Sequence, residues 1–259
     1  MTNNRQNIIE DSRELSILAS LYGLSFMLID KKTNDHTYFE YAFEMTHPED
    51  LEEKLKSIIQ ERAVLQRKFE KVNIIHHNSL FTNIPKEVFD KTLLQTYLDY
   101  NVKLLPTDFI DYDYIGKFDL YNIYVPFVNI NNTFLNTNKQ VHYAHSSGMF
   151  MKKIGKIRKK QKQLPVFDIY INVFAKDFQI LVFHNEQIVL INQFEYDTVD
   201  DFLYFLFFAI ESLEIKDSKA KYHIGGVDTN HIIIKNLLDF NPKLDIIISE
   251  YHSKINNFF

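Results

Sequence analysis

The sequence contains no cysteine, which excludes disulfide bonds, thiol catalysis and thiolate metal sites. Glycine is also scarce: 6 residues are present, where average usage predicts roughly 18. Loops that surround a phosphate with backbone amides need close backbone approach and positive φ angles, which glycine supplies best. A chain so poor in glycine can form few such loops.

Long apolar segments are missing as well. No run reaches 18 apolar residues, and the most apolar stretch, residues 202–210 (FLYFLFFAI), is too short to span a membrane. It follows two aspartates, so it predicts a buried helix. The polar N-terminus lacks the apolar core of a signal peptide. These features predict a cytoplasmic protein without membrane contact.

The charge balance is weakly acidic, with 29 basic and 34 acidic residues and a net charge of −5. Proteins that bind duplex nucleic acid are strongly basic, so nucleic acid is not an expected partner. One run, residues 152–162, holds seven basic residues in eleven. It predicts a solvated helix face, and the alternative is a patch for an acidic partner or RNA.

The most informative feature that is present is an internal repeat. Residues 15–29 align with residues 167–181 at a constant offset of 152 without a gap. Both segments predict a β-hairpin, because each is apolar and rich in β-forming residues on either side of a short turn. Three of the matched pairs are Ile17 with Ile169, Phe26 with Phe178, and Ile29 with Leu181. The alternative is two unrelated hairpins that share a generic β pattern.

The similarity continues beyond the hairpins. In each copy a third strand, a helix, a fourth strand, a second helix and a last strand are expected, in that order. The expected segments are 37–43, 48–59, 71–76, 85–100 and 120–125 in the first copy, and 187–194, 199–211, 221–225, 231–240 and 244–249 in the second. The second copy's first helix is apolar nearly all round, so we expect it to be the more buried of the two. The pattern predicts a mixed α/β unit of order β-β-β-α-β-α-β, present twice.

Two domains follow from this repeat. Residues 1–164 are predicted to form an N-terminal lobe with an inserted strand at 141–145 and a linking helix at 147–162. Residues 165–259 are predicted to form a C-terminal lobe.

This duplicated unit resembles the actin, Hsp70 and sugar-kinase superfamily, whose members have two ribonuclease-H-like lobes. More narrowly, nearly the whole chain resembles a bacterial family of unknown function with an actin-like ATPase fold. The segments Glu14-Leu-Ser-Ile, Gly23-Leu-Ser-Phe and His145-Ser carry this resemblance. It implies the fold and supplies no activity.

Members of the superfamily that hydrolyse ATP carry Asp-x-Gly at the first hairpin of each lobe. The carboxylate positions Mg²⁺ or its water, and the glycine opens the turn amides to the phosphates. Ser20 and Asn172 occupy these positions here, and neither is a carboxylate. Tyr22 and Phe174 add bulk to the two turns. We therefore expect no catalytic residues and no enzyme activity.

One superfamily feature is retained in the second copy. Gly225-Gly226 follows its fourth strand and resembles the glycine pair that lies near the adenosine. Asp228 or Thr229 is expected to cap the helix that begins at His231. Residues Ser20, Asn172, Gly225, Gly226 and Asp228 are thus the candidates for a nucleotide cleft. The alternative is that the glycines serve strand-to-helix packing alone.

Histidine pairs do not predict a metal site. His76 and His77 are adjacent on an expected strand, and His142 and His145 are three apart, so each pair points to opposite faces. Nuclease chemistry would need a first carboxylate where Asn172 stands.

We therefore expect a pseudoenzyme: a non-catalytic, degenerate actin-like protein that serves as an interaction or regulatory module. The expected partner is another protein, with a homodimer as one alternative, and no cofactor is expected. The alternative function is nucleotide binding with weak or no ATPase activity, with ATP and Mg²⁺ as ligands.

Overall fold

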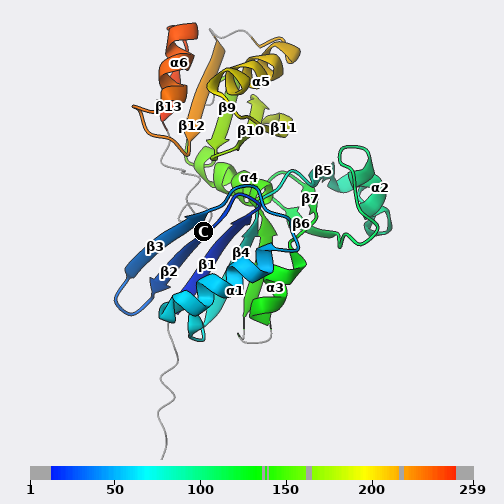
Figure 1. Cartoon of the computed structure of the whole chain (residues 1–259). Helices are drawn as coiled ribbons and strands as arrows, with labels where there is room; N and C mark the ends of the chain where they lie inside the picture. Colours follow the sequence, from blue (N-terminus) through cyan, green and yellow to red (C-terminus); the bar gives the residue numbers. More distant parts are fainter. Residues whose placement is uncertain (1–12, 136–137, 139, 162–164, 216–218, 249–259) are drawn as a thin grey trace, which may run out of the picture. The chain divides into compact units, whose positions relative to one another are not determined.

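The computed structural model describes residues 13–135, 138, 140–161, 165–215 and 219–248 (Figure 1). The chain forms two compact units. The first comprises residues 1–77 and 126–144, and the second comprises residues 78–125 and 145–259. The expected domain boundary between residues 164 and 165 stays a prediction.

The first unit contains a five-stranded sheet of order β3-β2-β1-β4-β8. Strands β1 (Arg13–Ser20), β2 (Gly23–Asp30) and β3 (Asp35–Ala42) are antiparallel, and β4 (Lys71–His76) runs parallel to β1. The last strand is β8 (Val141–His145).

Helices α1 (Leu51–Glu61) and α3 (Val128–Leu135) pack on this sheet, and a 3-10 turn at Ala63–Gln66 follows α1 (Figure 1). Alternate residues of β1 and β2 point to the same face, where Ile17 and Phe26 are fully buried. They meet Leu51 and Leu55, which are four apart on one side of α1. The core of this unit therefore forms where alternate strand residues pack against one side of a helix.

The second unit repeats this arrangement. Its five-stranded sheet has the order β11-β10-β9-β12-β13. Along the chain the elements are β9 (Phe167–Val173), β10 (Asp177–His184), β11 (Gln187–Glu195), α5 (Val199–Ser212), β12 (Ala220–Gly225), α6 (Ile232–Phe240) and β13 (Ile246–Ile248). The order β-β-β-α-β-α-β is thus present in both units, which confirms the expected fold class.

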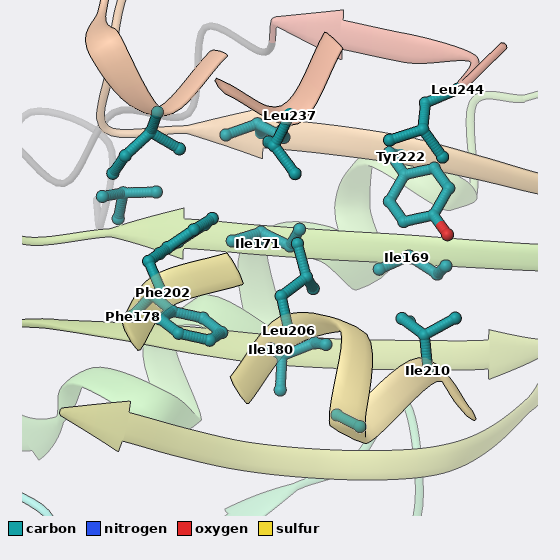
Figure 2. Packing of buried hydrophobic residues seen from close by; sticks show 14 of the residues in the cluster. Ile169, Ile171, Phe178, Ile180, Phe202, Leu206, Ile210, Tyr222, Leu237 and Leu244 are labelled. Atoms are coloured by element: carbon teal, nitrogen blue, oxygen red, sulfur yellow. The ribbon is translucent and has the colours of Figure 1, made fainter. Parts of the chain in front are cut away.

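Helices on both faces cover this second sheet. Ile169, Ile171, Phe178 and Ile180 meet α5 and α6 on one face (Figure 2). The opposite face packs on α4 (Ser146–Arg158) through a separate cluster of buried residues. A sheet covered on both faces gives nearly continuous apolar strands, as in ILVF of β10.

Helix α5 is more buried than α1, as expected, because five of its fourteen residues are exposed against five of eleven in α1. Phe202, Leu206, Ala209 and Ile210 are buried, but Tyr204 and Phe208 are 64% and 57% exposed. Because residues three and four apart share a helix face, one side faces the core while the aromatic rings at 204 and 208 stack on the opposite side. A helix that is apolar nearly all round is therefore still exposed along one side.

Residues 78–125 form a smaller layer of the second unit. Strands β5 (Phe81–Pro85), β7 (Leu120–Tyr124) and β6 (Asp111–Ile115) make a three-stranded sheet in that order. Helix α2 (Leu94–Asp99) packs on it, after short 3-10 turns at Lys86–Val88 and Lys91–Leu93. Leu98, Ile123 and Val125 form its core.

Two sequence expectations are wrong here. Residues 120–125 do not provide the last strand of the first five-stranded sheet, because they pair with residues 81–85 and 111–115 instead. Strand β8 takes that place, and α3 is the helix that precedes it. Residues 85–100 hold only a six-residue α-helix. An alternating pattern identifies a strand but does not name its partner.

Candidate functional site

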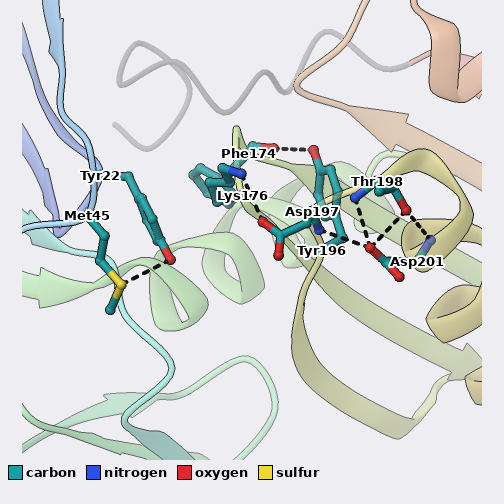
Figure 3. Close-up of polar contacts among 8 residues, drawn as sticks. All are labelled: Tyr22, Met45, Phe174, Lys176, Tyr196, Asp197, Thr198 and Asp201. Carbon is teal, nitrogen blue, oxygen red and sulfur yellow. Dashed lines mark hydrogen bonds and ion pairs between the residues drawn. The ribbon is translucent and has the colours of Figure 1, made fainter.

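The turn between β1 and β2 contains the first expected site residue, Ser20. Its hydroxyl donates to the carbonyl of Gly23 at 3.1 Å and accepts from the backbone N–H of Tyr22 at 3.2 Å. The carbonyl of Tyr22 accepts from Phe43 N–H at 2.8 Å. The Tyr22 hydroxyl lies 3.7 Å from the sulfur of Met45 (Figure 3). Both hydrogen bonds of the Ser20 hydroxyl are thus made within its own turn.

Asn172 is buried on the opposite side of the second sheet from α5 and α6. It is 2% exposed and pairs with Gln179 on one side and Gly225 on the other. Residues two apart on a strand share a face, so Asn172 faces α4 together with Tyr170. Gln179 donates to the hydroxyl of Ser146, the first residue of α4, at 2.8 Å. The Asn172 side chain is therefore buried under α4, and its Oδ1 atom has no hydrogen-bond partner among the described residues.

Gly226 lies where two backbone segments approach closely. Its φ angle is +90°, and a Cβ atom at this position would stand 2.0 Å from the carbonyl oxygen of Val173. Only glycine fits such a position without displacement of the strand. The close packing of β12 on β9 thus requires this glycine by itself.

Asp228 forms a local turn. It is exposed, and its carboxylate accepts from the backbone N–H of Asn230 at 2.8 Å. Helix α6 begins at Ile232, and His231 caps it by accepting from Ile233 N–H at 3.3 Å. The expectation that Asp228 or Thr229 caps this helix is therefore wrong, because the helix starts too late for either.

A pocket of about 320 Å³ lies beside Gly226 at the carboxyl ends of β9 and β12. Its walls come from four segments: residues 173–175, 196–199, 226–227 and 231–233. The carboxyl ends of parallel strands are the usual place for ligands in α/β sheets. Of the five expected site residues, Gly226 alone lines this pocket.

The polar groups around this pocket are paired with one another (Figure 3). Tyr196 donates its hydroxyl to the carbonyl of Phe174 at 2.5 Å, and burial raises the pKa of Tyr196 to about 12. The Lys176 ammonium lies 2.9 Å from Asp197. Thr198 and Asp201 form a capping box at the start of α5.

These residues do not fit ATP with Mg²⁺. Hard cations take oxygen ligands from carboxylates, and the hairpin positions hold the hydroxyl of Ser20 and the amide of Asn172 instead. Across the described part of the chain, no group of three or more His, Cys, Asp or Glu side chains could hold a metal ion.

A buried ion pair under α4 was not anticipated from the sequence. Arg158 contacts Asp168, and both side chains are nearly inaccessible, at 6% and 0% exposure. The Tyr170 hydroxyl donates to Asp168 at 2.8 Å, and His223 Nε2 lies 2.8 Å from the other carboxylate oxygen. Burial, and then the charge of Asp168, raise the pKa of Tyr170. The only sequence signal was a lone aspartate in an apolar strand.

Buried histidine in the first unit is structural. His76 Nε2 donates to the side-chain oxygen of Asn131 at 3.0 Å, and its Nδ1 accepts from Phe127 N–H at 3.2 Å. Burial lowers the pKa of His76 to about 3, so the ring is neutral. It holds the start of α3 against the end of β4.

A larger groove of about 830 Å³ lies in the second unit. One wall is β5 with the residues before it, and the facing wall is residues 188–193 of β11. Residues 101–103, which follow α2, also line the groove. Within the described residues, β5 pairs only with β7, and β11 only with β10, so both walls are sheet edges.

Comparison with family models gives a match over residues 2–243 to a family described as "Protein of unknown function (DUF3822)". The chain belongs to this family. No curated protein matches it significantly. Among the described residues, no helix has both the length and the hydrophobicity to cross a membrane.

Two solved structures are similar to this DUF3822 member. A Bacteroides thetaiotaomicron VPI-5482 protein with an actin-like ATPase fold and unknown function is 20% identical, with a TM-score of 0.75. The match covers 92% of this chain and 91% of that one. The PilM–PilN type IV pilus biogenesis complex is 8% identical with a TM-score of 0.57, and 90% of this chain and 87% of that one are covered. These likenesses show the actin-like ATPase fold.

Proposed function

We propose that this protein is a non-catalytic, degenerate actin-like protein that binds an extended segment of a partner protein. The observation that carries this proposal is the groove between the edges of β5 and β11, in which two strands present backbone groups to the same space. An unpaired strand edge is a template for another strand, since its N–H and C=O groups lack partners.

The direction of the backbone groups on β11 follows from its register. Tyr196 N–H donates to the carbonyl of Lys176, so this pair faces β10. Alternate residues of an antiparallel strand face opposite neighbours. Residues 190, 192 and 194 thus bond to β10, whereas Ile191 and Gln193 direct their N–H and C=O groups outward at the groove.

Backbone hydrogen bonds also fix the direction of the N–H and C=O groups on β5. Val125 N–H donates to the carbonyl of Leu80, and Lys86 N–H donates to that of Asp119. Even-numbered residues of β5 therefore face β7, and Asn83 directs its backbone outward at the groove. Pro85 has no N–H, which limits the length of this edge.

A strand that binds by edge addition gains main-chain hydrogen bonds of roughly 0.5–1.5 kcal/mol each. The groove lining mixes apolar residues such as Leu190 with the amides of Asn101 and Asn192. Such a surface suits an extended peptide, whose backbone needs hydrogen bonds while alternate side chains need apolar contact.

Two further points support this proposal. At the positions where ATP-hydrolysing members have carboxylates, Ser20 is hydrogen-bonded within its own turn and Asn172 is a neutral, buried amide. In addition, one similar structure is described as the PilM–PilN type IV pilus biogenesis complex, so this fold occurs in a complex of two proteins.

The test places a photo-crosslinking amino acid at Asn192, an exposed groove residue, in the native host, with Lys235 on α6 as the control position. We expect a defined partner peptide to be captured from position 192 and not from 235. Ile191→Pro removes one outward N–H and should abolish capture while circular dichroism stays native.

Capture that persists in Ile191→Pro, or that occurs equally from position 235, would contradict edge addition at β11. If the captured peptide comes from a second copy of this chain, the partner is a homodimer.

Nucleotide binding is the second candidate, and the pocket beside Gly226 favours it. Calorimetric titration with ATP and ADP, with and without Mg²⁺, tests it directly. Ile232 is 53% exposed and lines the pocket, so Ile232→Trp fills the space without loss of core packing. Leu238→Trp, on the same helix but not lining the pocket, is the matched control.

Micromolar binding that is lost in Ile232→Trp and retained in Leu238→Trp would establish a nucleotide site. Absence of heat at millimolar nucleotide would exclude it.

A further inference from the structure

A second pocket, of about 450 Å³, lies between α4 and the turn that joins β6 to β7. It shares no lining residue with the groove between β5 and β11 or with the pocket beside Gly226. Five of its nine lining residues are lysines: Lys117, Lys152, Lys153, Lys156 and Lys159. Four of the seven basic residues in the run seen in the sequence therefore line a concave surface, whereas Arg158 is buried against Asp168.

The helical spacing gathers four of these lysines. Lys152, Lys156 and Lys159 follow one another by four and three residues, so they lie on one side of α4 with Lys153 next to them. The other side of the helix, with Ile154, is buried against the second sheet. These four lysines therefore lie on the side of α4 that is turned away from the second sheet, and all of them line one pocket.

The fifth lysine comes from a different element. Lys117 lies in the β6–β7 turn, and a Cβ atom at Gly155 would stand 2.9 Å from its Cγ atom. Because Gly155 has no side chain, the stem of Lys117 can lie directly against α4. The position of Lys117 beside the helical lysines is therefore fixed by packing.

The lysines of this pocket outnumber the acidic groups close to it, of which Asp113 interacts with Lys152. Within the described residues, no carboxylate lies within ion-pair distance of any of the five lysines. Burial, and then repulsion by Lys156 and Lys160, lower the pKa of Lys153. Burial raises the pKa of Asp113, and the charge of Lys152 opposes this shift. The pocket therefore carries an excess of like charge.

The helix dipole explains part of this arrangement only. Cations are favoured at the C-terminal end of a helix, which accounts for Lys156 in the last turn and Lys159 at the C-cap. Lys152 lies in the middle of α4, and Lys117 lies outside it. Like charges at four-residue spacing destabilise a helix, so a bound anion would relieve a cost that the free protein carries.

We propose that this pocket binds a ligand that carries two or more phosphate groups. Lysine binds phosphate as a compact point charge, and several ammonium groups around one hollow match several phosphates better than a single monoanion. The volume lies in the range of small-ligand sites, and Ile115 and Met149 add apolar contact. No aromatic side chain lines the pocket, so it offers no platform on which RNA bases could stack.

The test titrates the full-length protein with sodium tripolyphosphate by calorimetry at low salt, with monophosphate as the comparison ligand. The pocket variant is Lys117→Gln with Lys156→Gln. The control is Lys235→Gln with Lys243→Gln, which removes the same charge from exposed positions outside the pocket. Each partly exposed ammonium contact contributes roughly a factor of three, so the pocket variant should bind about tenfold more weakly.

We expect tripolyphosphate to bind more tightly than monophosphate, with weaker binding as the salt concentration rises. Absence of binding, or equal weakening in the pocket and control variants, would overturn the proposal. Binding of RNA or of an acidic peptide without binding of tripolyphosphate would overturn it as well.

A second arm identifies the source of the phosphates. Sedimentation with vesicles that contain phosphatidylinositol bisphosphate, against vesicles of phosphatidylcholine alone, tests for a lipid headgroup. Binding of both tripolyphosphate and the phosphoinositide vesicles supports a headgroup ligand. Binding of tripolyphosphate alone supports a free phosphorylated metabolite.

Discussion

The buried pair of Arg158 and Asp168 gives the sharpest prediction about stability. Asp168 is fully buried and also accepts from the Tyr170 hydroxyl, while the Arg158 guanidinium lies 3.9 Å from the ring centre of Phe183. Asp168→Asn keeps the shape and removes the charge, which leaves Arg158 buried without its counter-ion. Loss of one partner of such a pair costs about 3–5 kcal/mol in free energy of unfolding.

This cost is a large part of a typical total stability of roughly 5–15 kcal/mol. Arg158→Met should be similarly damaging, because it leaves Asp168 uncompensated. The double variant removes both charges, so its loss should fall short of the sum of the two single losses by about 2 kcal/mol or more. The exposed pair of Lys176 and Asp197 is the control, and its removal should cost about 0–1 kcal/mol.

Urea denaturation followed by circular dichroism measures all of these variants. Additive losses at Arg158 and Asp168, or losses no larger than those of the exposed pair, would refute the reasoning that the two buried charges depend on each other.

Three further predictions concern packing and protonation. Leu206→Ala should lower the free energy of unfolding by about 3–5 kcal/mol, because the side chain is fully buried. Phe208→Ala, on the exposed side of α5, should change it by less than about 0.5 kcal/mol. Similar urea midpoints for the two variants would contradict this prediction. Gly226→Ala should lower the melting temperature strongly, because its Cβ would overlap the Val173 carbonyl, and a melting curve like the wild type's would show that the strands can separate. His76 has a pKa of about 3 in the folded state and about 6.5 when unfolded, so its stabilisation is present above pH 6.5 and is lost as the pH falls. Between pH 7 and pH 5 the wild type should therefore lose roughly 2 kcal/mol more than His76→Gln, and parallel pH profiles would contradict a neutral buried ring.

The repeated hairpin could be predicted because its signal is local. Ile17 and Ile169 are both fully buried, as are Phe26 and Phe178. The gapless alignment does not hold across the hairpin, however, because Ile17 pairs with Phe26 whereas Ile169 pairs with Val182. Alternation of apolar and polar residues reports which face of a strand is buried, and this needs no knowledge of distant residues. The order of elements in each unit follows from the same information.

Strand partners were not predictable in this way. Residues 120–125 have the pattern of a buried strand, and only their pairing with β5 and β6 separates them from the first sheet. The groove between β5 and β11 could not be predicted for the same reason. Its walls come from residues 79–85 and 188–193, which are about a hundred positions apart in the chain. The lysine run was visible in the sequence, but its concave shape depends on Lys117 and Gly155.

Two glycines, Gly23 and Gly226, lie so close to a neighbouring backbone that their substitution is a poor test of nucleotide binding. A Cβ atom at Gly23 would stand 2.6 Å from the carbonyl oxygen of Tyr41, and one at Gly226 would stand 2.0 Å from that of Val173. Each glycine is thus required where a strand end meets a neighbouring backbone, whether or not a phosphate ever binds nearby. Substitution of Gly226 would disturb packing and any bound nucleotide together, so loss of binding in that variant would carry no information about contact. Ile232→Trp separates the two effects, because it fills the pocket from an exposed helical position and leaves the strand contact unchanged.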